Sequence, residues 1–213
     1  MKSQKTAKLT DKNLVHKELS LDAIYNMDCI AGMAMLPRAC VDLIITDPPF
    51  AIDFKSKRSN YNRKCTRVID GYNEVAVKDY GNFTKRWMTE AVRIMKDSAS
   101  MYVFSGWNNL KDILITIDEL GLTTVNHIIW KHQFGVVTSR KFVTSHYHCL
   151  YVCKNESLRK FFPYSRFGKE EDDKNGGSLH YKDKEDFWII KREYWTGDQK
   201  TPTKLPVSLL KKC

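Results

Sequence analysis

The sequence predicts an α/β fold, a three-layer sandwich in which helices cover both faces of a central sheet. The first observation is Val41–Thr46, whose sequence VDLIIT is β-branched and apolar with no polar face. Such a run is typical of a strand buried on both sides, as in a parallel sheet. The second observation is that further strands alternate with helical periodicities along the chain. The third is size, because 213 residues with 42% hydrophobic content can form one domain with a substantial core.

The first elements are expected in the following order. Residues 1–20 form a polar arm with a net charge of +3, since five lysines stand against one aspartate and one glutamate. Asp22–Met27 is predicted as a short strand, and Cys29–Leu36 as a short helix that ends before a proline. After the strand at Val41–Thr46, residues 51–80 contain few core signals and are predicted as a long loop.

Two amphipathic helices are predicted in the middle of the chain. Apolar residues recur at helical spacing on one face of each, and these are Phe83, Trp87, Ala91 and Ile94 in the first and Leu110, Ile113, Leu114 and Ile117 in the second. A strand is predicted between the helices at Ser100–Phe104. Two more strands follow at Thr123–Trp130 and Ser145–Cys153.

The last part of the chain changes character twice. Residues 170–186 carry seven acidic residues against three lysines and include an Asn-Gly-Gly sequence, which predicts a mobile surface loop. Residues 187–195 are again apolar and aromatic. Pro206 is predicted to lie at the first turn of a final helix.

The charge and cysteine content exclude several classes of protein. Lysine and arginine number 35 against 25 acidic residues, a formal net charge of +10 that favours a polyanionic partner. No apolar run approaches the roughly 18 residues that cross a bilayer, and the charged N-terminal arm does not have the pattern of a secretion signal. The six cysteines include no Cys-x-x-Cys, so we expect reduced thiols, no metal site and a cytoplasmic location.

The strongest candidate for chemistry is the sequence Asp47-Pro48-Pro49-Phe50, which directly follows the strand at Val41–Thr46. Ligands collect at the carboxyl ends of parallel strands. The prolines fix two backbone angles and remove two donors, so the Asp47 carboxylate and the Pro48 carbonyl can together accept both hydrogens of an exocyclic amine. Phe50 adds a flat face on which a base can stack. The alternative is a tight proline turn that is capped by a carboxylate.

Several segments together resemble the amino-methylating DNA methyltransferases that use S-adenosylmethionine and act on adenine N6 or cytosine N4. The match is to the β class, in which the catalytic motif lies near the N-terminus, and Asp47–Phe50 stands where this family has its D/S/N-P-P-Y/F motif. The other similar segments, in the family's order, are Asn26–Cys29 with Leu36-Pro37, Ser100–Gly106, Ile128–Lys131, Ser145–Lys154, Tyr194–Gly197 and Thr201–Pro206. The resemblance implies a Rossmann-like methyltransferase sheet in circularly permuted order.

The chain departs from this family at the glycine-rich F-x-G-x-G cofactor loop. In the β class that loop follows the segment similar to Thr201–Pro206, but here only residues 207–213 follow it, and no G-x-G occurs in the chain. The resemblance therefore implies that the C-terminal strands of the sheet are missing. It also implies a fragment, one part of a split enzyme completed by a second chain, or a non-catalytic remnant. We expect the chain alone to bind S-adenosylmethionine weakly or not at all.

The resemblance places Asp28 and Cys29 beside the cofactor, and Thr201, Thr203 and Lys204 in a segment that packs against it. These residues also have simpler interpretations. An aspartate before a helix is commonly an N-cap, and a Thr-Pro-Thr sequence is commonly a turn before a helix.

Two basic segments predict the surface that faces DNA. Residues 55–67 carry six cations and no acidic residue, and residues 131–169 carry eight cations against one glutamate, with phenylalanine and tyrosine interleaved. Cations that meet phosphates beside aromatic rings that stack on bases are typical of such a surface, and the alternative is a solvated basic face over an aromatic core. The residues predicted to contact DNA are Lys57, Arg58, Arg63, Lys131, Arg140 and Lys141.

These observations lead to one functional hypothesis. The chain is expected to be most of a site-specific DNA methyltransferase of a restriction–modification system, which transfers a methyl group from S-adenosylmethionine to adenine N6 in double-stranded DNA without a metal. Aspartate at the first position of the motif favours adenine, and the alternatives are cytosine N4 and a non-catalytic DNA-binding remnant. The expected regions are a basic arm at 1–20, part of the catalytic domain at 21–153, DNA-facing regions at 131–143 and 154–193, and the start of a truncated cofactor-binding segment at 194–213.

Overall fold

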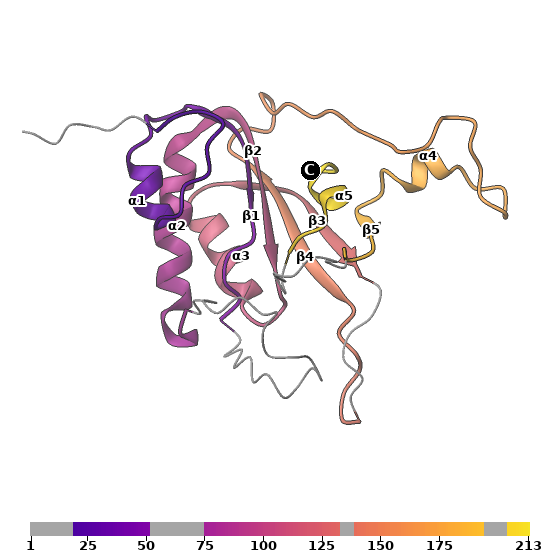
Figure 1. Ribbon diagram of the computed structural model, residues 1–213, viewed down its shortest axis with the longest axis horizontal. Coiled ribbons are helices and arrows are strands. Elements are labelled where there is room, and N and C mark those ends of the chain that lie inside the picture. Colours follow the sequence, from indigo (N-terminus) through magenta and orange to yellow (C-terminus); the bar gives the residue numbers. More distant parts are fainter. Residues whose placement is uncertain (1–18, 52–74, 133–138, 194–203) are drawn as a thin grey trace, which may run out of the picture.

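The computed structural model describes residues 19–51, 75–132, 139–193 and 204–213. The described residues form a mixed five-stranded sheet with its longer helices on one face (Figure 1). In chain order the elements are α1 (Cys29–Ala34), β1 (Val41–Thr46), the 3₁₀ turn η3 (Val77–Asp79), α2 (Tyr80–Ile94), β2 (Met95–Ser105), α3 (Leu110–Glu119), β3 (Thr123–Lys131), β4 (His146–Cys153), α4 (Leu179–Lys182), β5 (Phe187–Ile189) and α5 (Val207–Leu210).

The strand directions bring several functional positions to one edge of the sheet. The strand order is β1-β2-β4-β3-β5, with β1 parallel to β2 and β3 parallel to β5, while β4 runs antiparallel to both of its neighbours. At the end of β2, Ser105 pairs with His148, and at the end of β3, Lys131 pairs with His146. The carboxyl ends of β1, β2 and β3 therefore meet the amino end of β4 at one edge, which we call the carboxyl edge.

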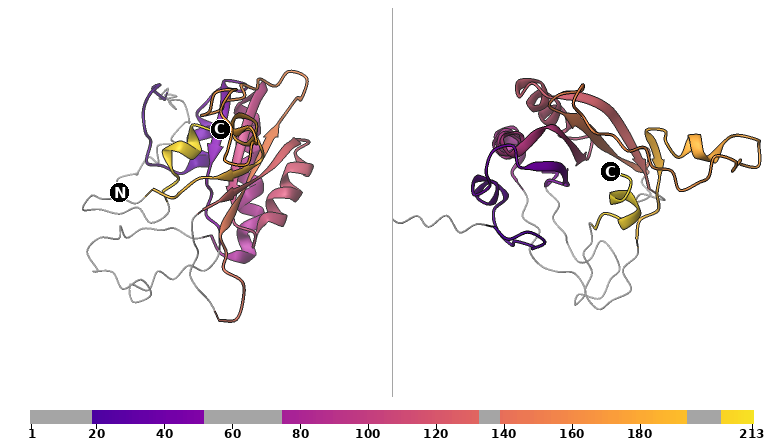
Figure 2. Two further views of the ribbon diagram at one scale, coloured as in Figure 1. Left: turned by 90° about the vertical axis from the view of Figure 1, so that its right-hand side faces the viewer. Right: turned by 90° about the horizontal axis from the view of Figure 1, so that it is seen from above.

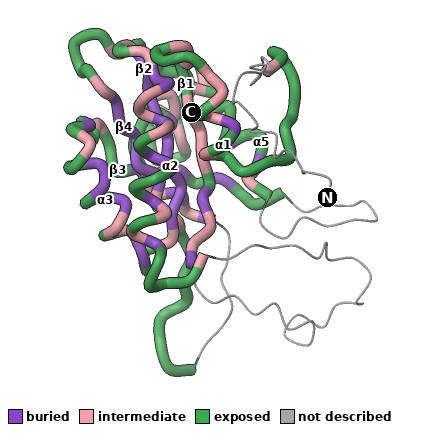
Figure 3. Tube along the Cα trace, turned by 90° about the vertical axis from the view of Figure 1, so that its left-hand side faces the viewer, coloured by how far each residue is buried: buried purple, intermediate pink, exposed green. Residues whose placement is uncertain are grey.

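The main core lies between the sheet and the helices α2 and α3. Helix α2 buries one stripe of side chains at helical spacing, including Trp87, Met88 and Ala91, and α3 buries Ile113 and Ile117. These side chains cover the central strands β2 and β4, where the buried positions are concentrated (Figure 3). The hydrophobic effect of this interface fixes α2 and α3 on the same face.

The opposite face of the sheet carries a second, thinner apolar layer. Phe104, Trp130 and Tyr151 are buried there together with Trp188 of β5 and Leu209 of α5. Figure 2 shows the short helix α5 on the other side of the sheet from α2 and α3. The described residues thus form three layers, but the third consists of a four-residue helix and irregular chain.

Most of the predicted elements are confirmed. The helix predicted at Cys29–Leu36 is α1, and both amphipathic helices are present as α2 and α3. The predicted strands at Val41–Thr46, Ser100–Phe104, Thr123–Trp130 and Ser145–Cys153 correspond to β1 to β4, and β2 begins earlier than expected. Pro206 is the N-cap of α5, next to the position predicted for it.

Three expectations are wrong in part. Asp22–Met27 forms turn and coil rather than a strand, pairs with none of the described strands and leaves Ile24 fully exposed. Strand β1 is parallel to β2 as predicted but is not buried on both sides, since it lies at the edge of the described sheet and leaves Leu43 45% exposed. Residues 170–186 include the helix α4, which begins where Ser178 Oγ accepts a hydrogen bond from the Tyr181 amide.

None of the helices in the described parts of the chain has the length and apolar character needed to span a membrane.

Candidate active site

The turn at residues 47–51 begins where β1 ends, at the carboxyl edge. Asp47 is exposed, and its carboxylate has neither a hydrogen bond nor an ion pair with another described residue. Desolvation by the surrounding atoms nevertheless raises the pKa of Asp47 to about 7. A ligand can therefore reach this carboxylate, while its neighbours replace enough water to disfavour the charged form.

The other end of the turn is anchored in the protein. Ala51 is 2% exposed and belongs to the main core. It has a φ of 49°, a left-handed conformation that residues with a Cβ rarely adopt. The side-chain amide of Asn109, at the start of α3, donates to the carbonyl oxygens of Phe50 at 2.5 Å and Ala51 at 3.3 Å. These contacts tie the end of the turn to the start of α3.

The Phe50 ring lies among residues from two other elements. Gly106 follows β2 directly, and a Cβ at this position would lie 3.2 Å from Cδ2 of Phe50. Tyr147 of β4 contacts the same ring edge to face, with centroids 5.5 Å apart. The hydroxyl of Tyr147 accepts a hydrogen bond from Arg192 at 3.1 Å, and the Arg192 guanidinium lies over the tyrosine ring. An aromatic and cationic cluster therefore extends from Phe50 across the carboxyl edge.

The Cys149 thiol lies near both the Asp47 carboxylate and the Cys213 thiol. Cys149 of β4 is fully buried, and Cys213 packs against the same face of the sheet. Burial raises the pKa of the Cys149 thiol, and the neighbouring Cys213 thiol and Asp47 act in the same direction. Cys149 is therefore a neutral packing residue at neutral pH rather than a nucleophile.

The structure describes three of the five residues predicted to bind the cofactor. Asp28 is the N-cap of α1, where Oδ1 accepts the amide hydrogen of Ala31 at 2.9 Å. Cys29 is the exposed first residue of that helix. Lys204 forms an ion pair with Glu193 at 2.7 Å. Thr201 and Thr203 lie outside the described residues.

The residues predicted to contact DNA divide into two groups. Lys57, Arg58 and Arg63 lie outside the described residues. Lys131 ends β3 at the carboxyl edge, and Arg140 and Lys141 are exposed in the segment that leads into β4. This second group is thus on the same edge as Asp47.

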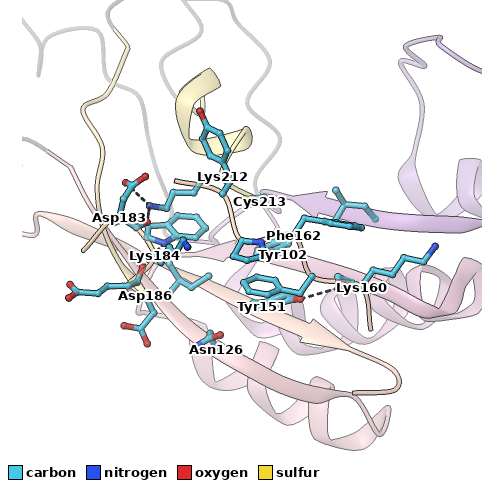
Figure 4. A pocket seen from close by; sticks show the side chains of 18 of the residues that line it. Tyr102, Asn126, Tyr151, Lys160, Phe162, Asp183, Lys184, Asp186, Lys212 and Cys213 are labelled. Atoms are coloured by element: carbon cyan, nitrogen blue, oxygen red, sulfur yellow. Dashed lines mark hydrogen bonds and ion pairs between the residues drawn. The ribbon is translucent and has the colours of Figure 1, made fainter. Parts of the chain in front are cut away.

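The other predicted DNA-facing region, residues 154–193, begins at the opposite edge, because β4 ends there. Its exposed rings Phe161, Phe162 and Tyr164 help to line a cavity of about 630 Å³ over the stacked rings of Tyr102 and Tyr151. Figure 4 shows this cavity, in which the ammonium group of Lys212 reaches Asp183. Asp47 is not among the residues that line this cavity, so the cavity does not include the candidate amine-binding carboxylate.

Three histidines lie close together on β3 and β4. His127 and His148 are joined by a ring-nitrogen hydrogen bond of 2.7 Å, and His146 packs edge to face against His148. Burial, together with the neighbouring histidines, lowers the pKa of His148 to about 4. Within the part of the chain that the structure describes, no group of three or more potential ligands has the arrangement needed to hold a metal ion.

Sequence reasoning missed Asn109, Gly106, Tyr147 and Arg192 as components of this site. The sequence did contain a signal for Gly106 and Asn109, because both follow the end of β2, the strand that runs parallel to β1. Tyr147 and Arg192 carried none, since only the pairing of β3 with β4 and β5 brings them to the same edge.

Comparisons with known proteins identify the family of the chain. Residues 41–213 match a family model described as DNA methylase, for enzymes that modify N6 or N4. The Type II methyltransferase M.HinfI of Haemophilus influenzae is 25% identical over 150 residues, which are 68% of this chain and 41% of that protein. The chain thus spans less than half the length of this relative.

One solved structure of a DNA methyltransferase is similar in fold, and a second aligns more weakly. The PvuII DNA methyltransferase, which is cytosine-N4-specific, aligns with a TM-score of 0.55 at 15% identity, covering 87% of this chain and 66% of that one. The complex of M1.HpyAVI with SAM aligns with a TM-score of 0.46 at 19% identity, covering 82% of this chain and 65% of that one.

Proposed function

The chain belongs to the N6/N4 DNA methylase family, and from this premise we propose that it methylates the exocyclic amine of a base in double-stranded DNA. The preferred target is adenine N6, and the methyl donor is S-adenosylmethionine. The observation that carries this proposal is the exposed Asp47 carboxylate, which has no partner among the described residues and lies at the carboxyl edge in the same turn as the Phe50 ring.

The chemistry assigned to the turn is the binding and orientation of the amine. The Asp47 carboxylate and the Pro48 carbonyl accept its two hydrogens, which leaves the nitrogen lone pair free to attack. Phe50 stacks on the base, which must leave the duplex because its amino group is not accessible within the stack. Alignment of the reactants and fixed charge supply most of the acceleration. Asp47, Pro48 and Phe50 thus contact the base, while Pro49 completes the turn.

S-adenosylmethionine, when bound, supplies an electrophilic methyl group. The residues proposed to hold it are Asp28, Cys29, Thr201, Thr203 and Lys204. The site at α1 fits this role in one respect: only Oδ1 of Asp28 is used for the cap, so among the described contacts Oδ2 is available to accept a hydrogen bond from an amino group.

The substrate and setting extend the same proposal. We assign duplex DNA to the carboxyl edge, where Lys131, Arg140 and Lys141 lie, and also to Lys57, Arg58 and Arg63. A site-specific enzyme of a cytoplasmic restriction–modification system is the setting that the family resemblance favours. The proposed partner is a second polypeptide that carries an F-x-G-x-G loop and contributes it to the cofactor site.

The test is methyl transfer from radiolabelled S-adenosylmethionine to duplex DNA, with the chain alone and with a polypeptide that carries the F-x-G-x-G loop. Asp47→Ala should abolish transfer while DNA binding remains nearly intact, and Asp42→Ala, at an exposed position of β1, serves as the matched control. Normal transfer by Asp47→Ala would show that the turn does not bind the amine.

Analysis of the labelled nucleoside separates the candidate reactions. N6-methyladenine supports the preferred reaction, and N4-methylcytosine supports the alternative that the same turn serves cytosine. DNA binding without either product, even with the F-x-G-x-G polypeptide present, identifies a non-catalytic DNA-binding remnant.

A further inference from the structure

We propose that Asn109 is a positioning residue that sets the conformation of the amine-binding turn. This role rests on the function proposed above. Asn109 lies 58 residues beyond Ala51, yet its side-chain amide donates to the carbonyl oxygens of both Phe50 and Ala51. An asparagine amide group has two donor hydrogens, so one side chain provides a hydrogen bond to each of two successive backbone carbonyls in the turn.

The position of Asn109 in its own helix does not explain these contacts. Asparagine is favoured at N-caps because its side-chain oxygen can accept an amide hydrogen from the first helical turn. Asn109 is the N-cap of α3, but its side chain makes no such bond. The side chain is buried, at 7% exposed, and is directed toward the turn instead. The contacts therefore serve the turn rather than the helix.

The turn requires such support because its backbone is strained at one end. Ala51 has a φ of 49°, and a residue other than glycine in this region costs on the order of 1 kcal/mol. The hydrogen bond from Asn109 and the burial of Ala51 in the main core both hold this conformation. Without them, the unstrained conformations of the turn become accessible.

The effect extends to Asp47 through the two intervening prolines. Pro48 and Pro49 have fixed φ angles, which leave few ways to absorb a displacement between Phe50 and Asp47. A shift of the Phe50 backbone therefore moves the Asp47 carboxylate, and a misplacement of about 1 Å can cost roughly 100-fold in rate. Asn109 acts on the reaction through the turn and does not contact the base.

Three variants of the full chain test this role. Asn109→Ala removes the donors, and Asn109→Asp retains the shape and the capacity to cap α3 but cannot donate. Asn108→Ala is the matched control, because Asn108 is the exposed neighbouring asparagine. Circular dichroism establishes that each variant is folded, and if Asn109→Ala is not, Asn109→Asp decides.

The first measurement is the ¹³Cα and ¹³Cβ chemical shifts of Phe50 and Ala51, which report backbone conformation and do not depend on activity. In both Asn109 variants the Ala51 shifts should move away from the values of its left-handed conformation, while in Asn108→Ala they should not. The second measurement is methyl transfer, in which kcat should fall about 10- to 100-fold with the KM for DNA within about twofold of the wild type.

The outcomes separate this inference from the proposed function. Unchanged chemical shifts at Phe50 and Ala51 in both Asn109 variants overturn the positioning role. Changed shifts with unchanged kcat also overturn it, as does an equal loss of activity in Asn108→Ala. If the wild type forms neither methylated base, the proposed function fails, and the chemical shifts alone decide whether Asn109 sets the conformation of the turn.

Discussion

The ring of Phe50 meets the ring of Tyr147 edge to face, with centroids 5.5 Å apart and an interplanar angle of 61°. The same ring lies against Gly106, where there is little room for a side chain. Tyr147 is in turn held by the hydrogen bond from Arg192. The ring that we propose to stack on the target base is therefore positioned by β4 and by the end of β2, and not by its own turn alone.

Gly106→Ala should lower kcat about fivefold to tenfold while the fold is retained. The added Cβ would lie 3.2 Å from Cδ2 of Phe50, which is closer than ordinary van der Waals contact, so the ring must move. Gly81→Ala is the control, because the added Cβ there meets only the Asp112 carboxylate at 3.4 Å. The measurement is the single-turnover rate of methyl transfer.

Tyr147→Ala tests whether the ring of Phe50 is confined between Gly106 and Tyr147. In the absence of Tyr147, the ring of Phe50 has space to yield, so Gly106→Ala should cost less in this background. The expected coupling energy is about 1 kcal/mol, typical of residues that share a contact. Strictly additive losses would show that Phe50 is not confined by both residues.

The parts of the fold that could be predicted from the sequence are those with a local signal. The apolar stripe of α2 and the β-branched run of β1 each identify an element without reference to any other. The burial of β1 and the strand expected at Asp22–Met27 depend on which neighbours are present. A local pattern cannot show that Leu43 lies at the edge of the described sheet or that Ile24 is exposed.

The same distinction applies to the site. The residues Asp47–Phe50 are contiguous, and their chemistry can be read directly. Asn109 bonds to Phe50 across 59 positions in the chain, and Arg192 bonds to Tyr147 across 45. The position of Asn109 after a strand parallel to β1 is a partial signal, but Arg192 meets Tyr147 only through the pairing of β3 with β4 and β5, which no spacing in the sequence identifies.

Methyl transfer should increase as the pH rises through about 7. Asp47 must be ionised to accept a hydrogen from the amine, and desolvation raises the pKa of this carboxyl to about 7. The measurement is kcat/KM across the neutral range, because this ratio reports groups of the free enzyme. DNA affinity measured over the same range is the control, and a flat kcat/KM profile would contradict the assignment.

Asp47→Asn should stabilise the folded protein at high pH. A pKa above the ordinary value of 3.8 means that the folded state binds this proton more tightly than the unfolded state. Stability therefore falls as the pH rises from about 4 to about 7, and the loss persists at higher pH. The Tm of Asp47→Asn should exceed that of the wild type above pH 7 and approach it near pH 4.

Asp42→Asn is the control for this comparison. Asp42 bonds to Lys96 at 2.6 Å, and this hydrogen bond lowers the pKa of Asp42. Removing the Asp42 carboxylate should therefore not raise the Tm at any pH. An equal gain in both variants would indicate a general effect of lowering the negative charge.

Asp183→Ala should lower the free energy of unfolding by about 2 kcal/mol, because it leaves two cations without their buried partner. Asp183 is buried and bonds to Arg166 at 2.6 Å and to Lys212 at 3.0 Å. Burial opposes its ionisation, but these bonds prevail and lower the pKa of Asp183 to about 2. Its contribution is present above about pH 4 and is lost as the pH falls toward 2. Urea unfolding measures the change, with the exposed Asp186→Ala as control.

The final prediction concerns which basic surface meets DNA. Replacing Lys131, Arg140 and Lys141 with alanine should lower the slope of log affinity against log salt by up to about 2.7, since each phosphate contact contributes about 0.9. Alanine at Lys160, Lys169 and Lys174 removes the same charge from exposed positions in the region that begins at the opposite edge, and it should leave the slope unchanged. Equal reductions would indicate that both surfaces contact phosphates. A reduction in the second set alone would transfer the DNA-facing role to residues 154–193, because only ions displaced from phosphates enter the slope.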